Sequence, residues 1–159
     1  MPAWPLAAER LSESRQEATE ILPGLWIGDA ENAMDRDWLK KKQVTAVINC
    51  TVNQDFAQEA DLKHALRISV RDNRAPSEIV KMSQYLPPVV EKLHEWLSQH
   101  NVLVHCRAGR QRSSSVVVAY LMRYGALSLD DAIMLLRSKR PSACKPSCNF
   151  YESLQQFTR

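Results

Sequence analysis

Short apolar runs separated by turn-forming residues predict five strands along this chain. They cover residues 20–22, 25–27, 44–50, 66–70 and 102–105, and the run at 44–50 is rich in β-branched side chains, as a buried strand is. Pro23 and Gly24 lie between the first two runs and predict a tight turn that joins them.

Stretches with apolar residues at helical spacing lie between and after these strands. They predict helices over residues 29–42, 77–85, 112–122, 128–139 and 146–157. Pro87 and Pro88 predict a break or the first turn of a second helix that ends near His100. Strands that alternate with helices indicate an α/β fold, here a single domain with a mostly parallel central sheet flanked by helices.

The strand at 102–105 and the helix from 112 enclose the segment His105-Cys106-Arg107-Ala108-Gly109-Arg110-Gln111-Arg112-Ser113. A loop that closes onto a helix N-terminus directs backbone N–H groups at one point, where an oxyanion binds. The same environment favours the thiolate form of a cysteine. Arg112 can hold two phosphate oxygens at once, and Gly109 allows backbone conformations that a Cβ hinders. The segment therefore predicts a thiolate that faces a bound phosphate.

The pattern H-C-x-x-G-x-x-R-S resembles the phosphate-binding loop of the cysteine-dependent protein tyrosine phosphatase superfamily. Residues 21–28, 47–51 and 119–122 resemble core segments of its dual-specificity branch, and Arg140-Pro141 followed by residues 146–150 resembles the R-P…P-N-x-x-F segment. The chain is thereby identified as similar to atypical dual-specificity phosphatases from about residue 20 to residue 157. It departs from the family pattern at Ser147, where asparagine is common.

The resemblance implies a phosphocysteine mechanism that needs an acid for the leaving oxygen and a base for the attacking water. Asp72 is the candidate for both roles, because it follows a core strand at a family-like distance before Cys106. The carboxylates of equal type elsewhere are Asp55, Asp61, Asp130 and Asp131. Ser113 is expected to donate to the sulfur, which helps the thiolate leave, and His105 to tune the thiol without acting as the base.

Substrate choice is expected to depend on the loop residues 107–111, that is Arg107, Ala108, Gly109, Arg110 and Gln111. The predicted substrate is a phosphorylated protein, with phosphotyrosine, phosphoserine and phosphothreonine all admitted by a shallow cleft. The alternative is a phosphoinositide or other phospholipid, which the arginine-rich loop would also attract. A non-catalytic phosphate-binding module is disfavoured because Cys106, Arg112 and Asp72 are all present. A ring of cations from Arg71, Arg74, Lys139, Arg140 and Lys145 is expected around the mouth.

Length and composition fit one ordinary globular domain of 159 residues, 45% of them hydrophobic and 25% charged. We expect residues 1–19 to form an N-terminal arm or short helix and residues 20–159 the phosphatase catalytic domain. No stable membrane insertion, metal ion or organic cofactor is expected, and a net charge of +3 gives no argument for nucleic acid. Whether copies of the chain assemble is left open.

Four cysteines do not make a disulfide scaffold in a chain of this size, and the expected chemistry needs a reduced thiol, so we expect a cytoplasmic, or else nuclear, location. Two interpretations stay open for Cys50: a small buried hydrophobe, or a disulfide partner of Cys106, a choice that depends on geometry.

Overall fold

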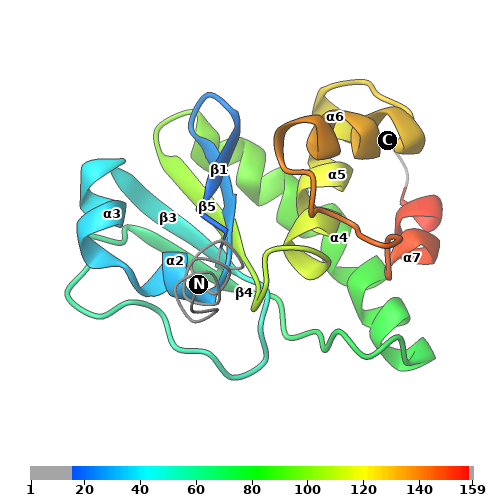
Figure 1. Ribbon diagram of the computed structural model, residues 1–159, viewed down its shortest axis with the longest axis horizontal. Coiled ribbons are helices and arrows are strands. Elements are labelled where there is room, and N and C mark those ends of the chain that lie inside the picture. Colours follow the sequence, from blue (N-terminus) through cyan, green and yellow to red (C-terminus); the bar gives the residue numbers. More distant parts are fainter. Residues whose placement is uncertain (1–15, 158–159) are drawn as a thin grey trace, which may run out of the picture.

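A five-stranded sheet forms the centre of the computed structural model, which describes residues 16–157 (Figure 1). Its strands, in the spatial order β1-β2-β5-β3-β4, are β1 (Thr19–Leu22), β2 (Leu25–Gly28), β5 (Asn101–His105), β3 (Val44–Asn49) and β4 (His64–Arg67). Only β1 runs antiparallel to its neighbour, across the turn at Pro23 and Gly24. The other pairs are parallel, so the predicted mostly parallel sheet is confirmed.

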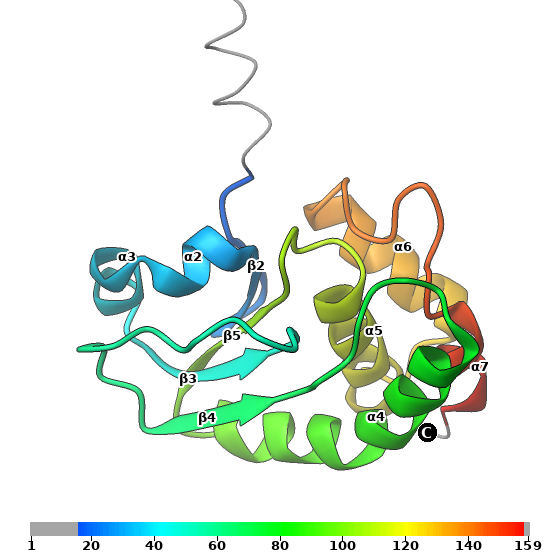
Figure 2. The ribbon, with the colours of Figure 1, turned by 90° about the horizontal axis from the view of Figure 1, so that it is seen from below.

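Helices cover both faces of the sheet (Figures 1 and 2). The short helices α2 (Ala30–Met34) and α3 (Arg36–Lys41) lie on one face. The other face carries the longer elements α4 (Pro76–Leu97), α5 (Arg112–Tyr124), α6 (Leu129–Lys139) and α7 (Tyr151–Gln156).

Strand β5 contributes to an apolar cluster on each face of the sheet, because successive side chains of a strand point to opposite faces. Leu103 packs with residues of α2 and α3, while Val102 and Val104 belong to the larger cluster beneath α4 and α5. All three side chains are buried, and this central position leaves the carboxyl end of β5 surrounded by the ends of β2 and β3.

The predicted break at Pro87 and Pro88 is wrong, because α4 is one continuous helix of 22 residues. Both prolines lie on its exposed side, where the carbonyl groups that they leave without an N–H partner can bond to water. The buried side continues across them from Met82 through Leu86 to Val90 at helical spacing. Burial of that apolar face outweighs the local cost of the two prolines.

Other element bounds also differ from the sequence prediction. The turns between Asp29 and Lys42 are two helices, because Asp29 caps α2 and Asp35 caps α3. The strand expected at residues 66–70 is β4, shifted toward the N-terminus, and the last helix begins at Tyr151 and not at Pro146. Helix α4 begins after Ala75, which gives no side-chain cap, and not at Ser77.

The N-terminal arm or helix expected over residues 1–19 lies almost wholly outside the described residues, so it stays a prediction. Over residues 16–157, no helix combines the length and the apolar character that a bilayer-spanning segment needs.

Candidate active site

The loop between β5 and α5 has its carbonyl groups bonded outward. The carbonyls of Arg107, Gly109 and Arg110 accept hydrogen bonds from the backbone of Ala30 (3.0 Å), Nε of Arg140 (2.9 Å) and the backbone of Cys144 (2.7 Å), respectively. Among the described residues, none accepts a hydrogen bond from the backbone N–H groups of residues 107–111. These N–H groups are therefore available to an anion at the N-terminus of α5.

Gly109 is required by this arrangement. Its backbone has φ +67°, in the left-handed region, and a Cβ there would lie 2.6 Å from Nη2 of Arg140 and 2.7 Å from the carbonyl oxygen of Gly28. Any larger residue would displace the loop or the arginine that supports it.

The side chains of Cys106 and Ser113 meet between the end of the loop's strand and the start of α5, where Arg112 is the first residue. The Cys106 sulfur lies 3.2 Å from the Ser113 hydroxyl, which is the contact expected for a hydroxyl that stabilises a thiolate. Nη1 of Arg112 donates to the carbonyl of Val70 at 3.0 Å. Its Nε is buried without a partner among the described residues, so this edge of the guanidinium is available to phosphate oxygens.

His105 is fully buried next to Cys106, with Nδ1 3.3 Å from the carbonyl oxygen of Cys106. Burial lowers the pKa of His105 to about 4, so its ring is neutral near neutral pH. A general base that acts on the thiol is not needed when the loop amides already favour thiolate.

Cys50 follows β3 and lies close to Cys106, because its backbone N–H donates to the carbonyl of the preceding residue His105 at 2.8 Å. The side chain is buried in the main core, and both Cys50 and Cys106 are free cysteines. Burial raises the pKa of the Cys50 thiol well above its ordinary value, and the charge of Cys106 raises it further. Cys50 is therefore a neutral thiol, and its role as a small buried hydrophobe fits this environment.

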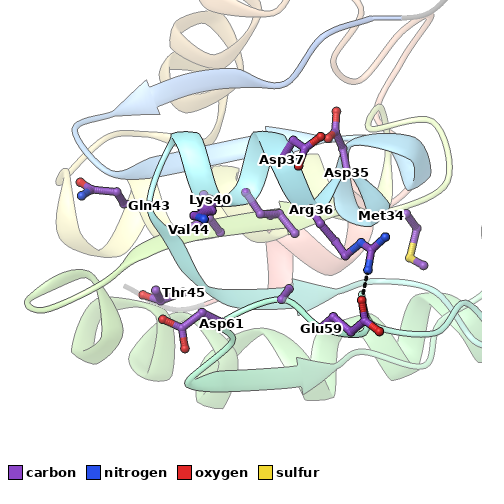
Figure 3. A pocket seen from close by; sticks show the side chains of 12 residues that line it. Met34, Asp35, Arg36, Asp37, Lys40, Gln43, Val44, Thr45, Glu59 and Asp61 are labelled. Atoms are coloured by element: carbon purple, nitrogen blue, oxygen red, sulfur yellow. Dashed lines mark hydrogen bonds and ion pairs between the residues drawn. The ribbon is translucent and has the colours of Figure 1, made fainter.

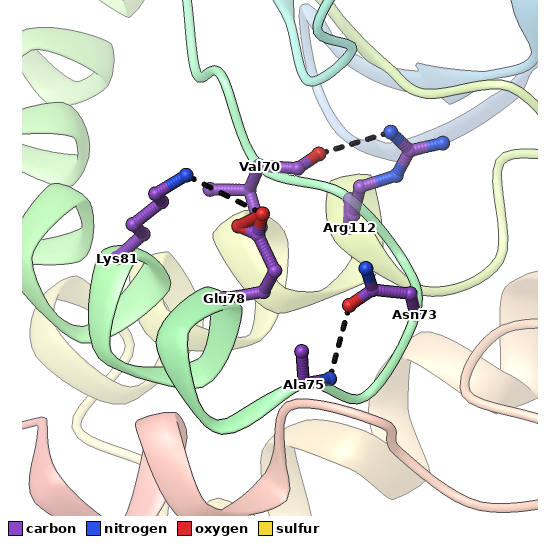
Figure 4. Close-up of polar contacts among 6 residues, drawn as sticks. All are labelled: Val70, Asn73, Ala75, Glu78, Lys81 and Arg112. Carbon is purple, nitrogen blue, oxygen red and sulfur yellow. Dashed lines mark hydrogen bonds and ion pairs between the residues drawn. The ribbon is translucent and has the colours of Figure 1, made fainter.

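Asp72 lies on an exposed loop that joins β4 to α4. Arg112 holds the start of this loop through Val70, and the side chain of Asn73 accepts a bond from the backbone of Ala75 (3.0 Å) at its other end (Figure 4). In the first turn of α4, the buried side chain of Glu78 pairs with Lys81. The predicted acid thus belongs to a loop that is anchored directly to Arg112.

The sequence placed Lys145 among the cations of the mouth and residues 146–150 in a family segment, but it did not predict the contacts that segment 145–149 makes with the loop. The buried side chain of Gln111 donates to the carbonyls of Lys145 (3.0 Å) and Ser147 (2.9 Å) and accepts from the backbone of Asn149 (2.9 Å). Nδ2 of Asn149 in turn donates to Asp72 at 2.8 Å. The side chain of Gln111 therefore holds segment 145–149 against the loop, and only its backbone N–H is left to bind an anion.

Arg140 corrects the expected ring of cations, because it is fully buried and does not reach the mouth. Its guanidinium also donates to the carbonyl of Glu17 (2.8 Å) and to the hydroxyl of Thr19 (2.9 Å), which ties β1 to the loop. The other cations are exposed, namely Arg71, Arg74, Arg107, Arg110, Lys139 and Lys145.

Two of the four alternative carboxylates are engaged elsewhere. Asp130 accepts from the Tyr151 hydroxyl, and Asp61 pairs with Lys63. Asp55 lines a cavity of about 330 Å³ with Phe56.

A larger cavity, of about 820 Å³, opens between α3 and the segment that precedes β4 (Figure 3). It is lined by Lys40, Asp61 and the ion pair of Arg36 with Glu59, among others; of the residues considered for the site, only the alternative acid Asp61 is among them. This cavity is therefore separate from the loop that carries Cys106, although it is the larger of the two cavities. Within residues 16–157, no cluster of three or more histidine, cysteine or carboxylate side chains forms a candidate metal site.

Comparison with known proteins agrees with this geometry. The family model described as "Dual specificity phosphatase, catalytic domain" matches residues 25–159. The chain belongs to the dual specificity phosphatase family. Human dual specificity protein phosphatase 9 is 36% identical over 142 residues, which cover 88% of this chain and 36% of the relative. Rat dual specificity protein phosphatase 18 is 33% identical over 140 residues, which cover 87% of this chain and 66% of the relative.

This chain thus spans about one third of the first of these dual specificity phosphatases and about two thirds of the second. Among solved structures, human DUSP28 aligns with a TM-score of 0.77 and 29% identity, over 89% of this chain and 93% of that one. A mouse putative dual specificity phosphatase, solved as a complex with zinc tungstate, aligns with a TM-score of 0.77 and 30% identity, over 88% of this chain and 85% of that one. The single-domain α/β fold of the family is therefore shown.

Proposed function

We propose that this dual specificity phosphatase domain hydrolyses phosphotyrosine and phosphoserine or phosphothreonine in proteins through a phosphocysteine intermediate. The observation that carries the proposal is the loop itself. Three of its carbonyls are bonded to other elements, its N–H groups have no acceptor among the described residues, and the buried Nε of Arg112, the first residue of the following helix, is also without a partner there.

In the first step, the Cys106 thiolate attacks phosphorus and the bond from phosphorus to the leaving oxygen breaks. The loop N–H groups and Arg112 bind the phosphoryl oxygens as charge develops on them. Asp72 gives its proton to the leaving alkoxide or phenoxide.

In the second step, Asp72 takes a proton from water, the water oxygen attacks phosphorus and the bond from sulfur to phosphorus breaks. The Ser113 hydroxyl, 3.2 Å from the sulfur, stabilises the departing thiolate. The step regenerates the thiolate and releases inorganic phosphate, and its residues require no metal or organic cofactor.

A protein substrate is favoured over a phospholipid by the relatives, which are named as protein phosphatases. The exposed arginines Arg107 and Arg110 add attraction for acidic groups that flank the phosphorylated residue. The phospholipid alternative has no such support, and short-chain phosphoinositides belong in the substrate panel as the comparison.

The leaving group provides the test of the mechanism. A general acid matters most when the departing oxygen is a poor leaving group. We expect Asp72→Asn to lower turnover of a phosphothreonine peptide far more than turnover of an activated aryl phosphate, and to remove the fall of the first-step rate at high pH. Cys106→Ser should abolish turnover of both substrates.

Pre-steady-state rates across pH measure these effects. Equal losses on both substrates, with an unchanged basic limb, would assign the acid role to another residue, and Asp55 would be tested next. Near wild-type turnover by Cys106→Ser would refute the phosphocysteine mechanism itself.

A further inference from the structure

One asparagine side chain joins the acid-bearing loop to the segment behind the nucleophile. Nδ2 of Asn149 donates to Oδ1 of Asp72 at 2.8 Å, and its Oδ1 accepts from Nε of Arg74 at 3.1 Å. The backbone N–H of Asn149 donates to Gln111, the residue before the phosphate-binding arginine. Asn149 therefore contacts Asp72 through its amide while its own backbone is fixed from the catalytic loop.

The orientation of the amide follows from its partners. Arg74 has only donors, so the amide must direct its oxygen there, and its nitrogen then faces the carboxylate. Oδ2 of Asp72 has no hydrogen-bond partner among the described residues, so this oxygen is the one that can carry the proton to a leaving group. The Asn149 amide thus donates to Asp72 through its nitrogen and accepts from Arg74 through its oxygen.

We propose that Asn149 is a positioning residue that holds the Asp72 carboxyl group toward the leaving oxygen, an inference that rests on the proposed function. Asp72 is exposed, and an exposed side chain samples several rotamers unless a partner restricts it. Displacement of a reacting group by about 1 Å can cost about a hundredfold in rate. Asn149 supplies the restriction from outside the loop that carries the acid.

Gln111 makes this restriction rigid. Its side chain is buried and makes three hydrogen bonds to segment 145–149, so Asn149 stands on a fixed backbone. The family asparagine expected at 147 is Ser147 here, and only the backbone carbonyl of Ser147 takes part in this network. Asn149, two residues later, is the side chain that reaches the acid.

The test compares two leaving groups in matched variants. Asn149→Leu removes both polar ends at nearly constant size, Asn149→Ala shortens the side chain, and Asn149→Gln keeps an amide. We expect the first two variants to lower turnover of a phosphothreonine peptide about tenfold and turnover of an activated aryl phosphate less than about twofold. Asn149→Gln should recover part of the loss, and the basic limb of the pH profile should change with the leucine variant.

A double-mutant cycle separates positioning from a structural role. In an Asp72→Asn background, Asn149→Leu should have no further effect, because the group that it positions no longer transfers a proton. The matched control is Gln99→Leu. Gln99 is an exposed amide just before the amino end of β5, whereas the proposed site lies beyond its carboxyl end, so both rates should be unchanged.

Equal losses on both substrates, or the same loss in the Asp72→Asn background, would show that Asn149 only supports the fold and would overturn the proposal. Thermal unfolding identifies any variant that is not folded, and the alanine and glutamine variants then carry the comparison. If Asp72→Asn itself shows no dependence on the leaving group, the assignment of the acid fails first, and the role of Asn149 fails with it.

Discussion

His105 couples the stability of this phosphatase domain to pH. Its side chain is fully buried at the end of β5, and burial lowers its pKa from 6.5 to about 4. The hydrogen bond with the Cys106 carbonyl and the charge of Asp29 act in the opposite direction, and neither outweighs the loss of hydration. The folded protein therefore keeps this imidazole neutral where an unfolded chain would protonate it.

The magnitude follows from proton linkage. Between pH 6.5 and pH 4 the unfolded chain binds more protons at this residue than the folded protein, so stability falls as the pH falls through that window. At pH 5 the loss is about 2 kcal/mol, and it levels off at about 3 kcal/mol below pH 4. A loss of this size is a substantial fraction of the roughly 5–15 kcal/mol that stabilises a typical domain.

Urea unfolding at pH 7.5 and pH 5.0 tests this value in the wild type and in His105→Asn. Carboxylates contribute equally to both proteins, so the difference between them isolates the histidine. We expect the wild type to lose about 2 kcal/mol more than the variant. An equal loss in wild type and His105→Asn would refute the conclusion that His105 is neutral in the folded state.

Two further substitutions test the phosphate site and the long helix. Arg112→Lys keeps the charge but loses the planar fork, so kcat/KM should fall by about a hundredfold or more, whereas normal kinetics would show that charge alone suffices. Pro88→Ala restores an N–H on the exposed side of α4 and should stabilise the protein by about 1–2 kcal/mol, because the helical cost of proline exceeds its benefit in the unfolded chain. Thermal unfolding measures this gain, and a lower Tm would show that Pro88 does not destabilise α4.

The catalytic loop could be predicted because its information is local. An apolar strand, a loop with Gly109 and a helix that begins at Arg112 follow one another within residues 101–124, so sequence order alone assembles them. The contact of Cys106 with Ser113 also joins residues only seven apart. The family resemblance and the physical pattern therefore agree on the same residues.

The supporting network could not be predicted because its partners are distant in the chain. The bond from Asn149 to Asp72 spans 77 residues, and the bond from Arg140 to Glu17 spans 123. Such pairs depend on the packing of the sheet and helices, which no local spacing encodes. The same reason explains the buried position of Arg140, since a charged residue in sequence is more often exposed.

The adjacent residues Gln111 and Arg112 fix the acid loop from two sides. Arg112 bonds directly to Val70 at the start of that loop, while Gln111 holds Asn149, which bonds to Asp72 within it. The proposed nucleophile Cys106 and the proposed acid Asp72 are thus supported by the same two residues, although they lie on different connections of the sheet. Removal of the Gln111 amide should therefore disturb the position of Asp72 as well as the loop that binds phosphate, because the carbonyls of Lys145 and Ser147 and the N–H of Asn149 lose their hydrogen-bond partner.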